Sequence, residues 1–256
     1  MSLAHHRLPI AALALLLVAA HAANAQAAPR EVRSSVNTWL DVATDLWLTT
    51  ATDLQLGAKV QRADRGAAPQ QVELRVGLQR PMGPRFRVAG GGVYVHNSPA
   101  GAFPAAAPYD ERRLWQHVLQ EQHLGRVALQ HRYRLEERWI EHPPPSGVGV
   151  AGDPDVSFAM RARYQLRATT SLGHGARGHL PYVTAYDELL KSVGPHASRN
   201  VVDQNRAYAG VGVRWSRALR GELGYVNQRI VRANGQQLEH AHVVQLSLAF
   251  TREAHG

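Results

Sequence analysis

Residues 127–139, VALQHRYRLEERW, contain the pattern that decides the fold. Apolar and charged side chains alternate along this stretch with a period of two. One face carries Val127, Leu129, Tyr133 and Leu135, and the other carries Gln130, Arg132, Arg134, Glu136 and Arg138. A period of two is typical of a β-strand, whose successive side chains point to opposite faces of the sheet. The stretch therefore predicts a strand with one apolar face and one highly charged face.

The same alternation recurs on both sides of this stretch, most clearly in residues 72–79 and 156–167. About eleven segments qualify as strands, at roughly 36–47, 53–62, 70–80, 85–96, 112–122, 126–139, 154–167, 178–190, 205–216, 219–230 and 240–250. Single-chain barrels of bacteria have even strand numbers. We therefore expect about twelve strands, with ten as the nearest alternative, and the region from Ser35 to Asp53 is the one most open to another division.

The connections between these segments alternate in length. Long ones, rich in Gly, Pro, Asn and Asp, lie around 63–70, 97–111, 140–154, 191–204 and 231–239. Tight turns lie between them at 81–84, 124–125 and 216–218, while the connection at 168–178 is longer than a turn should be. Long loops at one rim and short turns at the other are typical of transmembrane barrels. We predict an all-β, antiparallel up-and-down transmembrane β-barrel.

Alternation alone does not say which face points outward, because a soluble barrel hides its apolar face inside and a membrane barrel shows it to lipid. Many segments reach ten residues or more, enough for a tilted span. Aromatic residues that could form interfacial girdles lie toward many strand ends: Trp39, Trp47, Tyr94, Trp115, Tyr133, Trp139, Trp215 and Tyr225. We expect the apolar faces to meet lipid, with a soluble periplasmic barrel or sandwich as the alternative.

The N-terminus predicts export. His5, His6 and Arg7 precede an apolar run from Leu8 to Ala20, which closes on Ala23-Asn24-Ala25. The run is shorter than the about 20 residues that a transmembrane helix needs, so an uncleaved anchor is the weaker alternative. We predict a signal peptide over residues 1–25, a barrel domain over 26–256, and a location in the outer membrane of a Gram-negative bacterium.

Composition narrows the function. The chain of 256 residues contains no Cys, which excludes disulfides, thiolate metal sites and thiol nucleophiles. Its net charge of +9 comes from Arg residues that alternate along strands, a pattern that does not favour nucleic acid. His240 and His242 have no third metal ligand at useful spacing, and Gly147–Gly152 matches a dinucleotide fingerprint without the helix it requires. We expect no cofactor and no metal.

Several runs also carry a family resemblance. They include Leu114–His117, Gln130–Trp139, Arg161–Tyr164, Asn205–Gly210 and Glu222–Gln228, and the run HRYRLEERW is the most specific of them. With these the chain resembles the bacterial family known as domain of unknown function 2490, over about residues 36–250. The resemblance implies an outer-membrane β-barrel and assigns no ligand or reaction. A terminal aromatic usually serves the barrel-insertion machinery, a partner we expect here, whereas Phe250 is followed by six further residues.

If the polar faces line a lumen, they place many charges in one narrow barrel: Arg132, Arg134, Glu136, Arg138, Arg161, Arg163, Arg167, Glu188, Arg206, Arg214 and Glu222. The first interpretation is a cross-barrel network of Arg–Glu pairs that fills the interior and fixes strand register. Eight of these residues are basic and three are acidic. That excess favours a second interpretation, a lumen that admits or holds small anions. Basic loop residues could also contact lipopolysaccharide.

An enzyme is the least favoured class. A lipid hydrolase would need a nucleophile within reach of a base, and the sequence has no Gly-x-Ser-x-Gly elbow. The candidates that remain are His117, His131, Ser157, Ser171 and His174, each an ordinary wall or turn residue otherwise. We therefore predict a non-enzymatic, porin-like narrow pore or binding barrel for small anionic solutes. The alternatives are a structural or interaction barrel acting through its long loops, and a barrel lipid hydrolase.

Overall fold

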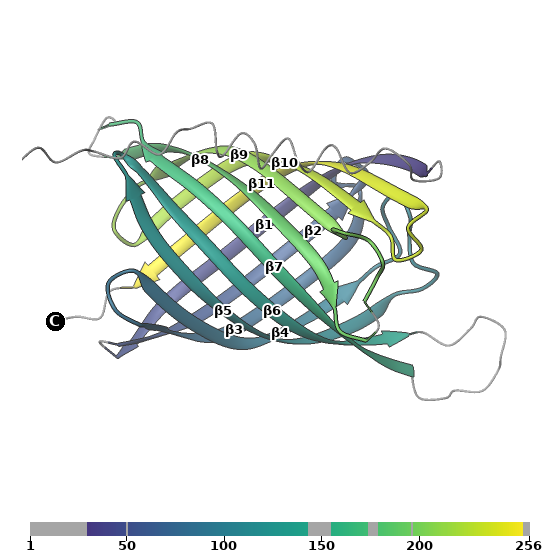
Figure 1. The fold of residues 1–256 in the computed structure, drawn as a ribbon. Helices are drawn as coiled ribbons and strands as arrows, with labels where there is room; N and C mark the ends of the chain where they lie inside the picture. The colour runs from purple at the N-terminus through teal and green to yellow at the C-terminus, as the bar shows by residue number, and fades with distance from the viewer. Residues whose placement is uncertain (1–29, 50, 143–154, 174–178, 196, 253–256) are drawn as a thin grey trace, which may run out of the picture.

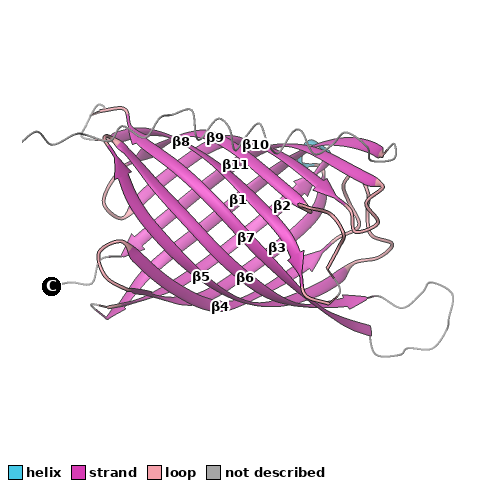
Figure 2. Cartoon of the chain, in the orientation of Figure 1, coloured by secondary structure: helices cyan, strands magenta, loops and turns pink. Residues whose placement is uncertain are grey.

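The computed structural model describes residues 30–49, 51–142, 155–173, 179–195 and 197–252. Most of these residues lie in strands (Figure 2). The strands are β1 (Glu31–Thr49), β2 (Thr52–Ala63), β3 (Ala68–Pro81), β4 (Phe86–Asn97), β5 (Tyr109–Leu124), β6 (Val127–His142), β7 (Asp155–Ser171), β8 (Leu180–Val193), β9 (Gln204–Arg214), β10 (Leu219–Val231) and β11 (Gln237–Arg252). The predicted signal peptide and the Gly147–Gly152 stretch lie outside the described residues.

The strands form one closed barrel in which each strand pairs with its neighbours in sequence (Figure 1). All sequential pairs are antiparallel, and the barrel closes through a parallel pairing of β1 with β11 that runs from Glu31↔Gln237 to Leu46↔Arg252. The predicted all-β up-and-down barrel of about twelve strands is confirmed, and the count over the described residues is eleven. An odd count leaves the first and last strands pointing the same way, so closure has to be parallel.

Most strands have an outward apolar face and an inward polar face, whereas on β4 the inward residues Val93 and Val95 are apolar and pack with Trp115. On β5, Leu114 is 51% exposed, whereas Glu111 and Arg113 on the opposite face are 2% and 7% exposed. On β3, Leu74 and Leu78 are about half exposed while Gln79 is buried. The pattern is the reverse of a soluble barrel, which hides its apolar residues inside. The predicted sidedness of the wall is therefore present in the structure.

The two ends of the barrel differ. One end carries the short turns after β1, β3, β5 and β9, together with the end of β11, whereas the longer connections 98–108 and 194–203 lie at the other end with the start of β1 (Figure 1). Two of the predicted long connections are short. Residues 64–67, with the 3₁₀ turn Asp64–Gly66, separate β2 from β3, and residues 232–236 separate β10 from β11, because these strands extend toward each other.

Two of the predicted girdle aromatics lie inside the barrel. Trp39 and Trp115 are 3% and 2% exposed, which corrects their assignment to an interfacial belt. Trp115 lies flat on the wall because Gly77 of β3 has no side chain: a Cβ there would come within 2.5 Å of the indole ring. Trp47, Tyr94, Tyr133, Trp215 and Tyr225 do point outward and are exposed. Within the described residues, no helix is long and apolar enough to span a membrane.

Candidate functional site: a cationic central cavity

The inward faces of the strands surround a central cavity of about 1310 Å³. Fifteen Arg or Lys side chains line it, against seven carboxylates. The basic ones are Arg33, Lys59, Arg75, Arg113, Arg126, Arg132, Arg134, Arg138, Arg161, Arg163, Arg167, Arg206, Arg214, Arg220 and Arg232. The acidic ones are Asp41, Glu73, Glu111, Glu121, Glu188, Glu222 and Glu239. Cationic groups therefore outnumber anionic ones about two to one along the cavity wall.

Ten of the eleven residues predicted for the lumen line this cavity. The eleventh, Glu136, is 2% exposed and lies within the wall next to them. They meet because the register brings their strands together: Arg134 of β6 is directly opposite Arg163 of β7, and Glu188 of β8 is directly opposite Arg206 of β9. Sequence alternation alone was sufficient to find these residues.

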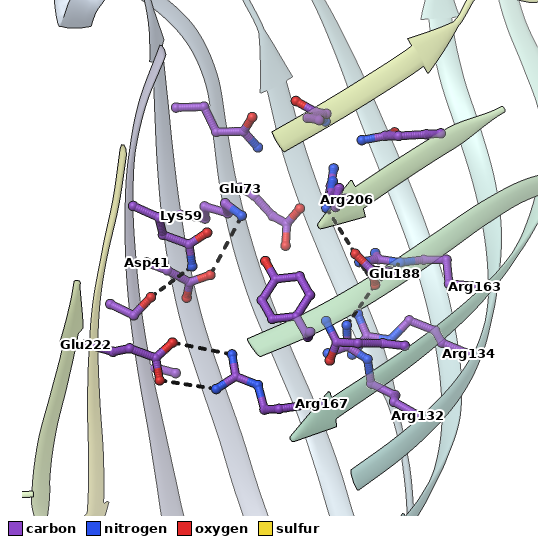
Figure 3. Close-up of a pocket in the computed structure, with 18 of the residues that line it drawn as sticks. Asp41, Lys59, Glu73, Arg132, Arg134, Arg163, Arg167, Glu188, Arg206 and Glu222 are labelled. Carbon is purple, nitrogen blue, oxygen red and sulfur yellow. Dashed lines mark hydrogen bonds and ion pairs between the residues drawn. The ribbon is translucent and has the colours of Figure 1, made fainter. Parts of the chain in front are cut away.

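Glu188 is the hub of the charged belt. Its carboxylate is 2.8 Å from Arg132, 2.7 Å from Arg163 and 3.4 Å from Arg206. Figure 3 shows these three guanidinium groups converging on Glu188, from three different strands. Because Glu188 is 2% exposed, its charge has to be compensated by these contacts. The hub joins the neighbouring strands β6, β7, β8 and β9 along the inner wall of the barrel.

Two further carboxylates act in the same way. Glu136 lies 2.5 Å from Arg161 and 2.6 Å from Arg163. Glu111 holds both nitrogens of the Arg113 fork, at 2.7 and 2.9 Å, and also pairs with Arg138. Arg113 and Arg138 are directly opposite on β5 and β6, where two like charges would repel each other. The shared Glu111 removes that repulsion.

The charges thin out toward the short-turn end. Arg167 pairs with Glu222 through two hydrogen bonds of 3.2 and 3.5 Å (Figure 3). Tyr182 donates a further hydrogen bond to the same carboxylate. Arg214 and Arg220 are directly opposite each other on β9 and β10. Within the described residues, neither of these two has a carboxylate within ion-pair distance. Two like charges therefore lie side by side at this mouth of the cavity.

Sequence reasoning missed part of the site. The predicted lumen residues do not include Lys59, Glu73 and Arg75. These residues alternate with apolar residues on β2 and β3, so the period-two pattern that indicates an inward position is present for them as well. Arg75 lies across Gly57, where a Cβ would come within 2.8 Å of its guanidinium. Glu73 contacts Arg113 at 3.3 Å and Arg75 at 3.5 Å. The charged belt therefore continues onto the strands β2, β3 and β5.

Aromatic side chains inside the barrel were also missed. Tyr186 and Tyr208 stack with their ring centroids 4.7 Å apart, and Arg167 lies 5.2 Å above Tyr186. Lys59 lies 3.9 Å and Arg206 5.2 Å from the ring of Trp39. Cations favour the negative faces of aromatic rings. These ring contacts add to the ion pairs that the same cations make with Asp41, Glu188 and Glu222.

The connection after β4 crosses the mouth at the long-loop end. Its Phe103 lines the cavity, with the guanidinium of Arg33 4.6 Å and that of Arg232 5.7 Å from its ring. Arg33 also donates to the carbonyl of Ala102, and Arg232 to the carbonyl of Phe103, both at 3.0 Å. We call residues 98–108 the strap. This segment follows β4 and is held by Arg33 of β1 and by Arg232, the residue after β10.

The candidates for lipid hydrolysis are dispersed. His117 accepts a hydrogen bond from Arg134, and His131 contacts Tyr164 at 2.9 Å on the outer face. Ser157 lies 2.7 Å from His142, and Ser171 accepts from the backbone of Gly173. Within the described residues, none of these four candidates therefore contacts another. His174 lies outside the described residues. Among the residues described, no three His, Asp or Glu side chains form a metal-binding group.

A family model described as "Protein of unknown function (DUF2490)" matches residues 36–239. Neither the curated proteins nor the solved structures contain a match to the chain. The matched region begins within β1 and ends within β11, so it covers the strands that build the barrel and its charged interior. The chain therefore belongs to the DUF2490 family.

Proposed function

We propose that the protein is an outer-membrane β-barrel whose interior takes up small anions. Several features support the membrane. The strands are 11 to 19 residues long, enough to cross a bilayer at a tilt, and closure leaves no unpaired strand edge. Their outer face is apolar, with outward aromatic residues. The N-terminal segment 1–25 acts as the signal peptide, and lipid, lipopolysaccharide and the insertion machinery are the partners that such a location requires.

The cationic excess of the cavity carries the proposal for anions. The carboxylates of the wall are already shared: Glu188 serves three guanidinium groups and Glu136 two at short distance. Further basic groups, such as Arg214 and Arg220, have no close carboxylate in the described part of the chain. A confined space with one sign of charge raises the local concentration of counter-ions. Small anions are consequently favoured over cations inside the barrel.

The reversal potential of the purified protein tests this proposal. The protein is placed in a planar bilayer between two KCl solutions of different concentration, and current is recorded against voltage. The cationic wall predicts a reversal potential on the side of chloride selectivity. A cation-selective current contradicts the proposal. The absence of any current also contradicts it if the purified protein binds no anion in solution. Sedimentation with the membrane fraction and heat-modifiable gel migration test the location separately.

The strap favours a second candidate, a structural or interaction barrel. Because Arg33 and Arg232 hold Phe103 at the long-loop mouth, the cavity is obstructed there, and a barrel closed at one end would bind rather than conduct. In that case the connections 97–111 and 140–154 would contact surface lipid or a partner, although most of 140–154 lies outside the described residues. Absence of conductance together with binding of surface lipopolysaccharide would favour this alternative. The lipid-hydrolase alternative rests on one nucleophile–base contact, between Ser157 and His142 at 2.7 Å.

A further inference from the structure

Arg134 is a buried cation without a close carboxylate. It is 7% exposed, and its nearest carboxylate oxygen, on Glu136, lies 3.8 Å away. Glu136 makes much shorter contacts with Arg161 and Arg163, at 2.5 and 2.6 Å. A buried charge costs free energy unless it is paired and hydrogen-bonded. Arg134 also lies over the ring of Trp115, 4.6 Å from its centroid, and these weaker contacts leave its charge only partly compensated within the described part of the chain.

The surroundings of Arg134 add positive charge. Arg132, Arg163 and Arg75 all repel it, and Arg163 is directly opposite Arg134 across β6 and β7. Glu188 does not relieve this, because it is already occupied by Arg132, Arg163 and Arg206. Figure 3 shows Arg134 next to Arg132 on the cavity wall. Of these four cations, Arg75 pairs with Glu73, whereas the other three share Glu136 and Glu188 with Arg161 and Arg206.

The unsatisfied hydrogen-bonding atoms at this place are donors. The Nε atoms of Arg132 and Arg134 are buried and have no acceptor within the described residues. His117 accepts a hydrogen bond from Arg134 at its Nδ1, which leaves the proton on its Nε2, and this atom also has no partner there. Unpaired donors beside an excess of positive charge call for an acceptor with negative charge.

We propose that Arg132 and Arg134 form a binding site for a phosphate group, either inorganic phosphate or the phosphate of a small monoester. Both side chains line the central cavity, so a solute in the cavity can reach them. Guanidinium forks match the oxygens of phosphate in pairs, and a tetrahedral anion accepts from two forks at once. Chloride offers no such directed acceptors. This site rests on the proposed function, since the anion must enter the barrel to reach it.

The test measures phosphate binding to the full-length protein in detergent. Isothermal titration and the unfolding midpoint are recorded with inorganic phosphate, with a simple phosphomonoester and with chloride at equal ionic strength. For the wild type we expect phosphate to bind and to raise the midpoint beyond the effect of chloride. Arg134→Gln should weaken phosphate binding about tenfold or more, as loss of a charged hydrogen bond does. Tighter binding of the monoester would identify an ester as the ligand.

The control is Arg112→Gln, which removes an arginine from the outward face of β5, where the side chain is 64% exposed. It should leave phosphate binding unchanged. Arg134→Gln should also be at least as stable as the wild type without phosphate, because it removes an under-compensated buried charge. Equal phosphate binding by the wild type and Arg134→Gln would overturn the site.

If Arg134→Gln does not fold, the wild-type protein still tests the proposal. A shift of its unfolding midpoint by phosphate that is no larger than the shift by chloride overturns the proposal. Arg134→Lys, which keeps the charge but loses the fork, should bind phosphate less tightly than the wild type. Anion selectivity without a phosphate effect would remove this site alone. Cation selectivity would remove the proposed function as well.

Discussion

Replacing the hub carboxylate, Glu188→Gln, should destabilise the barrel strongly. The substitution keeps the shape of the side chain and removes the charge that faces three guanidinium groups at 2.7 to 3.4 Å. Breaking a buried ion pair costs about 3–5 kcal/mol, because the remaining charge is left uncompensated. Arg132 and Arg206 keep 21% and 17% exposure toward the cavity and can be hydrated. We therefore expect a loss of about 3 kcal/mol, the lower end of that range.

Urea unfolding in detergent or lipid, followed by tryptophan fluorescence, measures this change. The matched control is Glu121→Gln, which removes a carboxylate that is 33% exposed and lies 3.4 Å from the 46% exposed Arg87. Such an exposed pair contributes about 0–1 kcal/mol. If Glu188→Gln cost no more than Glu121→Gln, the hub would be hydrated and would not hold the strands together.

Three further predictions follow from separate parts of the structure. Val76→Arg, on the outward face where Val76 is 49% exposed, should lower the free energy of unfolding in a bilayer by about 2–4 kcal/mol. The control Val201→Arg, in a connection, should leave it nearly unchanged. Equal losses in the two variants would argue against contact of Val76 with lipid. Replacing both Arg33 and Arg232 by Ala should release the strap, so that proteases cleave within 98–108 faster than in the wild type; unchanged cleavage would show that Phe103 is held by other contacts. Burial raises the pKa of Asp203, but hydrogen bonds from Ser198 and from the backbone of Ser192 lower it by more, to below the usual 3.8. These hydrogen bonds stabilise the connection before β9 at neutral pH, and the stabilisation is lost as the pH falls through the lowered pKa of Asp203. Hydrogen exchange in this connection should therefore accelerate below about pH 4. In Asp203→Asn the exchange rate should already be high and should not rise further at low pH.

The faces of the strands could be predicted from sequence because a period of two is a local property. Arg132 and Arg134 were assigned to the interior from their alternation with Tyr133 and Leu135, without knowledge of any neighbouring strand. The same reasoning explains why Lys59, Glu73 and Arg75 could have been included. Their partners Asp41 and Arg113 lie on β1 and β5, so their role is visible only when the strands are placed in the barrel.

Long-range features could not be predicted. The parallel pairing of β1 with β11 depends on how the barrel closes, and no residue of either strand signals it. The three partners of Glu188 lie 18 to 56 positions away in sequence, so the pairing follows from register. The sequence predicts Trp115 in an interfacial girdle, because aromatic residues are common where a barrel wall meets the membrane interface. Its actual place depends on Gly77, a residue on another strand that leaves room for the indole ring.

Sidedness in a bilayer can be measured directly by cysteine scanning along β3. The natural chain has no Cys, so single variants at residues 72–79 can be reconstituted and treated with a water-soluble thiol reagent. We expect cysteines that replace Val72, Leu74, Val76 and Leu78 to be shielded by lipid, and cysteines that replace Glu73 and Arg75, which line the cavity, to react. Uniform labelling, or reaction confined to the four apolar positions, would contradict a barrel that turns its apolar wall to the membrane.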